Sequence, residues 1–170
     1  MLHHEAGGHG FAKLEDEYYY ESQGTIPSSV VSDNISLRDH YGWGRNVDYT
    51  SDPNSVVWSK FISDSRYASE GLGVYEGACT YYKGAYRPTE TSIMVGNVGG
   101  FNAPSREAIY NRIHKLAYGE SWQFDYETFV SWDLSRQGRS RSMSSQTKYK
   151  PTAPPVILNQ HWENGRLVAN

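Results

Sequence analysis

Hydrophobic positions near the N-terminus have the spacing of a helix. Leu2, Phe11 and Leu14 can lie on one face, so the pattern predicts a helix over residues 1–14 that packs against a core. Three glycines interrupt this stretch, and glycine is a poor helix former. The acidic and aromatic residues 15–20 are expected to end the helix.

The middle of the chain alternates between turn residues and short apolar patches. Glycines and prolines punctuate residues 21–53, which predicts a loop. Asp52 suits an N-cap and Pro53 suits a first helical turn, so we expect a helix from there to about Ser63. Its apolar face would consist of Val56, Val57, Phe61 and Ile62.

The second half of the chain predicts two short strands followed by helices. The runs LGVYEG and ACTYYKGAY, within residues 72–86, have the composition of strands. Ser105 is the expected N-cap of a helix that reaches about Tyr118, and a further helix is expected over 125–134. The apolar face of the first of these helices would be formed by Ile109, Ile113 and Leu116.

These elements together predict an α+β fold that is mostly helical and has few short strands. Residues 1–135 are expected to form one domain. Residues 136–170 begin Ser/Arg-rich and continue Pro-rich, which indicates a C-terminal arm or linker.

The amino-acid composition excludes several classes of protein. The chain has 170 residues, 14% of them aromatic, so it has the material to bury a core and does not resemble a disordered segment. Its net charge is −3, and no basic excess indicates a nucleic-acid partner. No apolar run is long enough for a transmembrane helix. The single cysteine, Cys79, forms no internal disulfide and is expected to be a small buried side chain.

The first residues carry no secretory signal, because neither a basic segment nor an apolar segment precedes His3. Residues with metal-binding chemistry begin at His4, with no strand before them on which to pack. This abrupt start predicts an N-terminally truncated chain.

The most informative stretch is HEAGGHGFAKLEDEY, which starts at His4. Two neutral imidazoles, from His4 and His9, and a carboxylate suit Zn²⁺, and three protein ligands leave a position for water. Glu5 lies next to the first histidine, where it can act as general base. The other histidines, His3, His40, His114 and His161, are expected to be structural or solvated.

The spacing of the two histidines requires a distorted helix. Histidines four apart are offset by only about 40° in an α-helix, whereas a spacing of five gives an offset of about 140°. An extra residue absorbed in one wide turn would bring both rings to one ion. Gly7 and Gly8 stand where this turn must form, so we predict a π-bulge over residues 6–9.

The same stretch resembles the zinc motif of the bacterial IgA-peptidase family of metalloendopeptidases, a metzincin-like group with a motif of roughly HExGHxxxxLxDEY. Downstream, Ser92-Ile93-Met94 is similar to the metzincin Met-turn, and residues 58–88 are similar to the connecting part. The resemblance covers roughly residues 2–134. It implies a zincin-type catalytic domain that lacks its N-terminal sheet.

The resemblance implies roles for individual residues. His4 and His9 match the two histidine ligands of zinc, and Glu5 matches the general base. For the third ligand the family's DEY favours Asp16, with Glu15 next and Glu17 third. Met94 would be an apolar floor under the histidines. The tyrosine that some metzincins place two residues after this methionine is absent, because Gly96 stands there.

The resemblance also implies a function. We expect a zinc-dependent endopeptidase that acts on a protein or peptide substrate and is secreted or displayed at the cell surface. The alternative is a non-catalytic binding module that retains the fold and recognises glycans or proteins through its many tyrosines. A closed structural zinc site is disfavoured, because it would require a fourth protein ligand and no base.

Overall fold

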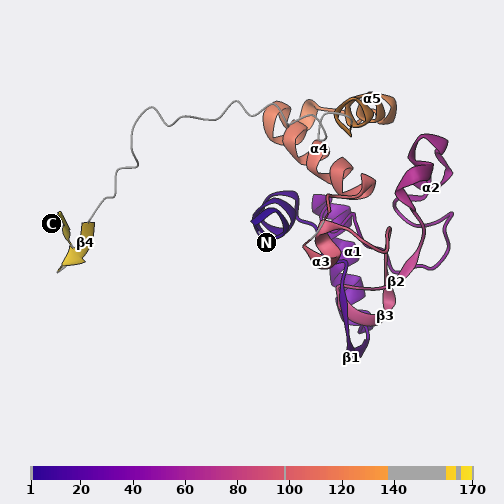
Figure 1. Cartoon of the computed structure of the whole chain (residues 1–170), viewed down its shortest axis with the longest axis horizontal. Helices are drawn as coiled ribbons and strands as arrows, with labels where there is room; N and C mark the ends of the chain where they lie inside the picture. Colours follow the sequence, from indigo (N-terminus) through magenta and orange to yellow (C-terminus); the bar gives the residue numbers. More distant parts are fainter. Residues whose placement is uncertain (1, 98, 138–159, 164–165, 170) are drawn as a thin grey trace. The chain divides into compact units, whose positions relative to one another are not determined.

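A computed structural model describes residues 2–97, 99–137, 160–163 and 166–169 (Figure 1). The chain divides into two compact units, Met1–Asp133 and Leu134–Asn170. The elements of the first unit, in chain order, are η1 (His3–Ala12), β1 (Tyr19–Thr25), α1 (Ser28–Tyr41), α2 (Ser59–Ser63), η2 (Ser65–Glu70), β2 (Tyr75–Ala78), β3 (Thr80–Arg87), α3 (Ile93–Gly96), α4 (Ala103–Tyr118), η3 (Gly119–Ser121) and the larger part of α5 (Tyr126–Gln137).

In the second unit, two strands form an antiparallel hairpin. These are β4 (Gln160–Glu163) and β5 (Arg166–Ala169), and Gln160 pairs with Ala169. The arm or linker predicted over 136–170 lies mostly outside the described part of the chain, and its described residues include this hairpin. Within the described residues no helix is long and apolar enough to span a membrane.

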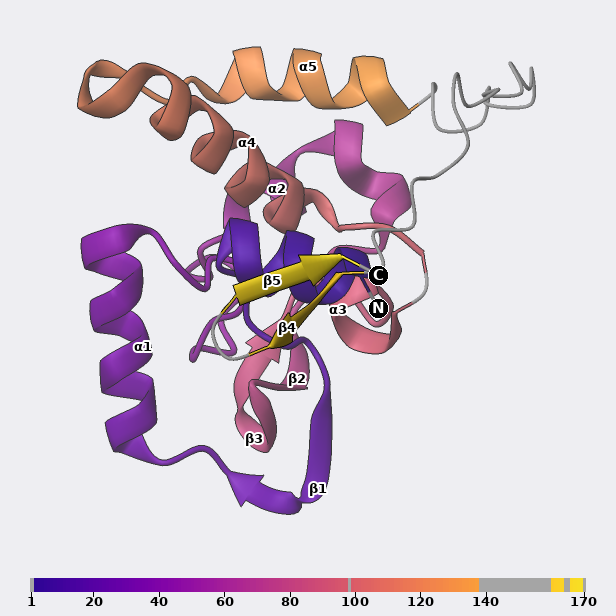
Figure 2. The ribbon, with the colours of Figure 1, turned by 90° about the vertical axis from the view of Figure 1, so that its left-hand side faces the viewer.

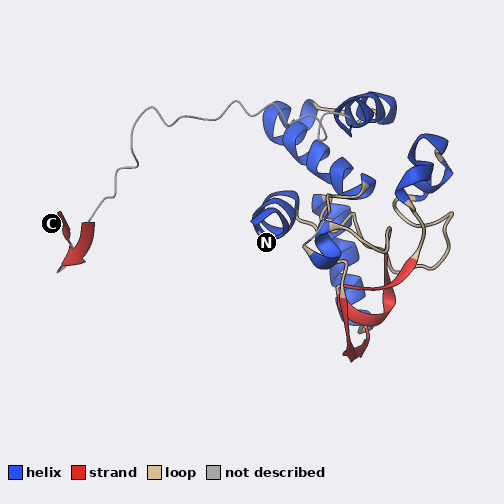
Figure 3. Ribbon diagram, in the orientation of Figure 1, coloured by secondary structure: helices blue, strands red, loops and turns tan. Residues whose placement is uncertain are grey.

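The first unit is an α+β fold around a three-stranded mixed sheet (Figure 3). The strand order is β1-β3-β2, in which β1 runs parallel to β3 and β2 runs antiparallel to it. The sheet lies at one end of the unit and α4 at the other, with η1 between them (Figures 1 and 2). The predicted α+β class with few strands is therefore confirmed, and the two strands predicted within 72–86 are present as β2 and β3.

Two clusters of buried side chains each join several elements of the unit. One joins the end of η1 to α3 and α4, and the other lies between the sheet and the N-terminal half of α1. The first consists of Ala12, Leu14, Ile93, Met94 and Ala108. The second consists of Ile26, Val47, Ala78, Cys79 and Ala85, with Val30 and Val31 of α1 packed against it. Cys79 is thus the buried side chain that the sequence predicts.

The prediction of a loop over residues 21–53 is wrong, because this stretch contains most of β1 and all of α1. Pro27 is the N-cap of α1 and Gly42, with a φ of 72°, is its C-cap. These two residues therefore mark the two ends of a helix and are not part of a loop. The helix has no buried residue, so it lacks the apolar stripe that would have identified it.

Helix boundaries and buried faces differ from the predictions elsewhere. Residues 53–57 form turns and α2 begins only at Ser59, although the Asp52 carboxylate accepts hydrogen bonds from Asn54 and Ser55 as an N-cap does. Asn102, not Ser105, is the N-cap of α4.

Four side chains expected in the core are instead exposed. The second half of α4 extends beyond the buried cluster, which leaves Ile113 and Leu116 exposed, while Leu2 precedes η1 and is also exposed. Phe11 is 38% exposed, whereas Leu14 is buried as predicted.

Candidate metal centre

A π-helix places the two motif histidines on the same side of η1. The π-helical hydrogen bonding extends over all of His3–Ala12, so the predicted π-bulge at residues 6–9 is confirmed and is longer than expected. Because each bond closes over five residues, side chains five positions apart come to the same face. His4 and His9 have this spacing, and their rings lie 4.9 Å apart.

The glycine pair in η1 has a packing role that the sequence does not reveal. Met94 of α3 is fully buried, and its sulfur packs against Gly8 so closely that a Cβ there would lie 2.5 Å from the Sδ atom. A Cβ added at Gly7 would lie 3.7 Å from Phe101, which is an ordinary contact distance. Met94 therefore packs against η1 at the turn between the two histidines.

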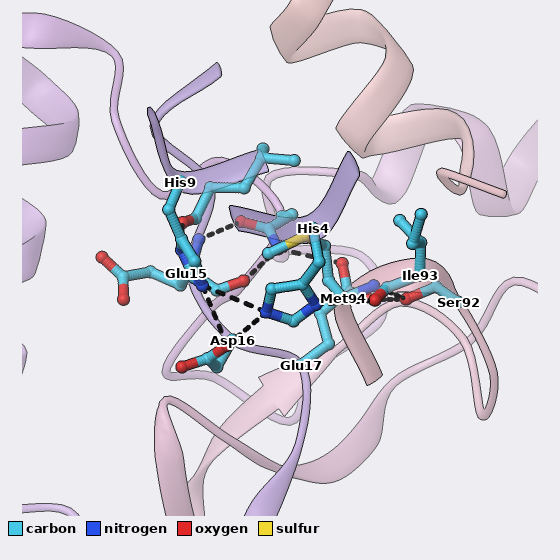
Figure 4. A network of polar contacts seen from close by, with 10 residues as sticks. His4, His9, Glu15, Asp16, Glu17, Ser92, Ile93 and Met94 are labelled. Carbon is cyan, nitrogen blue, oxygen red and sulfur yellow. Dashed lines mark hydrogen bonds and ion pairs between the residues drawn. The ribbon is translucent and has the colours of Figure 1, made fainter. Parts of the chain in front are cut away.

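Three ligand atoms converge at this face (Figure 4). The Nε2 atoms of His4 and His9 are 3.2 Å apart, and Asp16 Oδ1 lies 3.0 Å from the first and 3.1 Å from the second. Within the described residues these three side chains form the one group of histidines, cysteines and acids that could hold a metal ion. His3 is exposed and is not part of it.

Backbone carbonyls fix the orientation of both imidazoles. The Nδ1–H of His4 donates to the carbonyl of Ile93 at 2.7 Å, and the Nδ1–H of His9 donates to the carbonyl of Leu14 at 2.7 Å. A carbonyl can only accept, so each Nδ1 carries the proton. In the neutral rings the two Nε2 atoms then present lone pairs, which is the tautomer that a metal requires.

The loop that follows η1 is pinned so that Asp16 completes the group. Lys13 adopts a left-handed conformation with a φ of 58°, which ends η1. Asn46 then binds the backbone of Glu15 with both ends of its amide. The carbonyl of Asp16 accepts from the Cys79 amide at 2.8 Å, which ties the loop to the start of β3.

The two neighbouring acids point elsewhere. The Glu15 carboxylate is directed away from the three ligand atoms (Figure 4), and burial is the main cause that raises its pKa. Glu17 is fully buried and accepts hydrogen bonds from four side chains, those of Asn46, Ser92, Asn102 and Ser105. Burial raises the pKa of Glu17 despite these bonds. Glu17 thus joins residues 13–18, the loop that carries Asp16, to α3 and α4.

The group is open to solvent on one side. The His4 side chain is only 4% exposed, but His9 is 33% and Asp16 is 20% exposed. Glu5 is exposed, and no hydrogen bond or ion pair connects its side chain with another described residue. Its carboxylate is therefore free to interact with water or with a bound molecule.

Tyr18 is a residue near the group that sequence reasoning did not single out. Its ring lies 6.3 Å from that of His4, and the Asp16 carboxylate is close enough to act on its hydroxyl. Burial and the negative charge of Asp16 raise the pKa of Tyr18 to about 12, so the phenol keeps its proton at neutral pH. The signal was in the DEY triplet, where the tyrosine directly follows the acids.

The remaining histidines lie outside this group. His114 donates from Nδ1 to the carbonyl of Tyr110 on its own helix, and His40 contacts the ring of Tyr41. The side chain of His161 is outside the described part of the structure.

No protein-family model matches the chain, and no curated protein matches its sequence.

Proposed function

We propose that His4, His9 and Asp16 bind one zinc ion and that the chain is a zinc-dependent endopeptidase of zincin type. The observation that supports this proposal is the triangle of ligand atoms, whose sides measure 3.0, 3.1 and 3.2 Å. Tetrahedral zinc with bonds of about 2.0–2.1 Å separates its ligand atoms by about 3.3–3.4 Å. The triangle needs to expand only slightly to match this spacing.

The donor set also favours zinc. Two imidazole nitrogens and a carboxylate oxygen suit this ion, whereas calcium and magnesium prefer oxygen ligands alone. With both Nδ1 atoms protonated, the three converging atoms are all hydrogen-bond acceptors and repel one another. A cation among them relieves this repulsion. The group is therefore better suited to binding a cation than to stabilising the fold without one.

Three protein ligands and partial exposure favour catalysis over a closed structural site. When bound, zinc supplies an open coordination position and lowers the pKa of a water molecule there to about 7. Glu5 takes the proton from the attacking water and passes it to the leaving amine. The histidines are held by the Ile93 and Leu14 carbonyls, and the backbone of Asp16 is held by the Cys79 amide, so the ligands need little rearrangement.

A single substitution separates metal binding from hydrolysis. The Glu5→Gln variant should bind zinc with the wild-type stoichiometry and lose casein or peptide hydrolysis, because its side chain can no longer accept the proton. His9→Ala should lose both properties. Elemental analysis and a peptide-cleavage assay with and without chelator measure the two readouts. Cleavage by Glu5→Gln at the wild-type rate would exclude the proposed base.

A further inference from the structure

A second site in the first unit has a different chemistry. A pocket of about 370 Å³ lies between α4, residues 41–45 at the end of α1 and residues 120–124 at the end of η3. Its volume is within the range of pockets that bind small molecules. Ala12 at the end of η1 contributes to its wall, but none of the metal-binding side chains does.

Aromatic rings form part of the pocket wall. Trp43, Trp122 and Phe124 line it, and all three are partly buried, which leaves ring surface exposed to a ligand. Trp122 is fixed by stacking on His114, with ring centroids 5.1 Å apart and planes at 29°. These rings offer flat surfaces on which a planar group can stack.

The charges in the pocket are unbalanced in favour of cations. Four basic side chains line it against two acids. Glu107 is already engaged, because its carboxylate lies 2.5 Å from Lys60 Nζ and 3.9 Å from an Arg45 nitrogen. The second acid, Glu120, is exposed and forms no ion pair among the described residues.

The other two cations, Arg112 and Lys115, lie three residues apart on one face of α4. No ion pair joins either to an acid of the described part of the chain. The Nε atom of Arg112 is buried there without a hydrogen-bond partner. The charges of Arg112 and Lys115 are therefore not neutralised by an acid among the described residues, so together they favour an anion in the pocket.

We propose that this pocket binds a small planar organic anion. The ring of the ligand stacks on the tryptophan and phenylalanine faces, and its carboxylate or phosphate group accepts hydrogen bonds from Arg112 and Lys115. Guanidinium groups bind both kinds of anion through paired hydrogen bonds. This site is separate from the proposed metal centre and does not depend on zinc.

Tryptophan fluorescence tests the proposal directly, because two of the chain's five tryptophans line the pocket. The full chain is titrated in EDTA with indole-free probes: benzoate, phenyl phosphate, and neutral benzamide as the uncharged analogue of benzoate. EDTA excludes binding of the anions to a metal. We expect saturable quenching by at least one anion, with at least tenfold weaker binding of benzamide. The tighter of the two anions identifies the preferred charged group.

Variants then test whether the named residues carry the binding. Arg112→Gln should weaken binding of the anion about tenfold or more, because a charge-assisted hydrogen bond is lost. Arg112→Lys should restore part of it, while Lys83→Gln on β3 and His4→Ala in the metal group should bind as the wild type does. Thermal unfolding verifies that each variant is folded. Equal binding of benzoate and benzamide, wild-type affinity in Arg112→Gln, loss of binding in His4→Ala, or no response to either anion would each overturn the proposal.

Discussion

The two adjacent glycines of η1 should respond in opposite ways to the same substitution. In Gly8→Ala the new Cβ would lie 2.5 Å from Met94 Sδ and 2.9 Å from Met94 Cε. Ordinary contacts are about 3.5–4.0 Å, so the overlap is about 1 Å. In Gly7→Ala the nearest atom is Phe101 Cζ at 3.7 Å, which is an ordinary contact.

The magnitudes follow from burial and helix propensity. Met94 is 0% exposed, so it has little room to move, and overpacking of a core typically costs about 1–3 kcal/mol. Alanine in a helix gains about 0.5–1 kcal/mol over glycine. We therefore expect Gly8→Ala to lower the free energy of unfolding by about 1–2 kcal/mol. Gly7→Ala should raise it by about 0.5–1 kcal/mol.

Urea unfolding followed by circular dichroism measures both variants against the wild type. A double-mutant cycle isolates the contact: in a Met94→Ala background the cavity accepts the new methyl group, so the cost of Gly8→Ala should disappear. We expect a coupling energy of about 1–2 kcal/mol. Equal stability of the two alanine variants, or no coupling with Met94, would refute the packing of Met94 beneath the helix.

Three further predictions concern the metal centre and one surface ion pair. Asn46→Ala should lower zinc affinity about tenfold, because the Asn46 amide holds the backbone next to Asp16, and competition with a chromophoric chelator measures it. Free zinc at about 100 times its Kd should raise the free energy of unfolding by about 2.7 kcal/mol, and His4→Ala should abolish this gain. Hydrogen bonds from Arg66 lower the pKa of Asp64 to about 2, so the stability that Asp64 contributes is present above pH 4 and is lost as the pH falls towards 2. Asp64→Asn should therefore be less stable than the wild type by about 1 kcal/mol at pH 7, and urea titrations should show this difference shrinking below pH 4.

The sequence could predict the π-helix because two constraints met in one short motif. The spacing of His4 and His9 excludes a regular α-helix if both bind one ion, and the glycines mark where the distortion is tolerated. The convergence of Asp16 with the histidines depends on Asn46 and Cys79, which are distant in sequence. No local pattern contains that information, so the choice among Glu15, Asp16 and Glu17 could not be derived from spacing alone.

The failures have equally specific causes. Helix α1 has no buried residue and strand β1 is almost entirely exposed, so neither shows the hydrophobic period that identifies an element. Serine is a residue type that often caps a helix, but the buried hydroxyl of Ser105 instead donates a hydrogen bond to Glu17. Because Ser105 and Glu17 are distant in sequence, no local pattern could predict this contact. The anion pocket was not predicted because its basic and aromatic residues come from separate segments of the chain.

The carbonyl anchors of the two imidazoles belong to the main chain, not to side chains. Replacing Ile93 or Leu14 by another residue that fills the same space leaves the carbonyl oxygen in place. Point mutation therefore has no direct way to remove either anchor, whereas an anchoring aspartate could be lost in one step. Relatives of this chain can exchange one apolar residue of similar volume for another at these two positions and still keep both histidines ready for a metal ion.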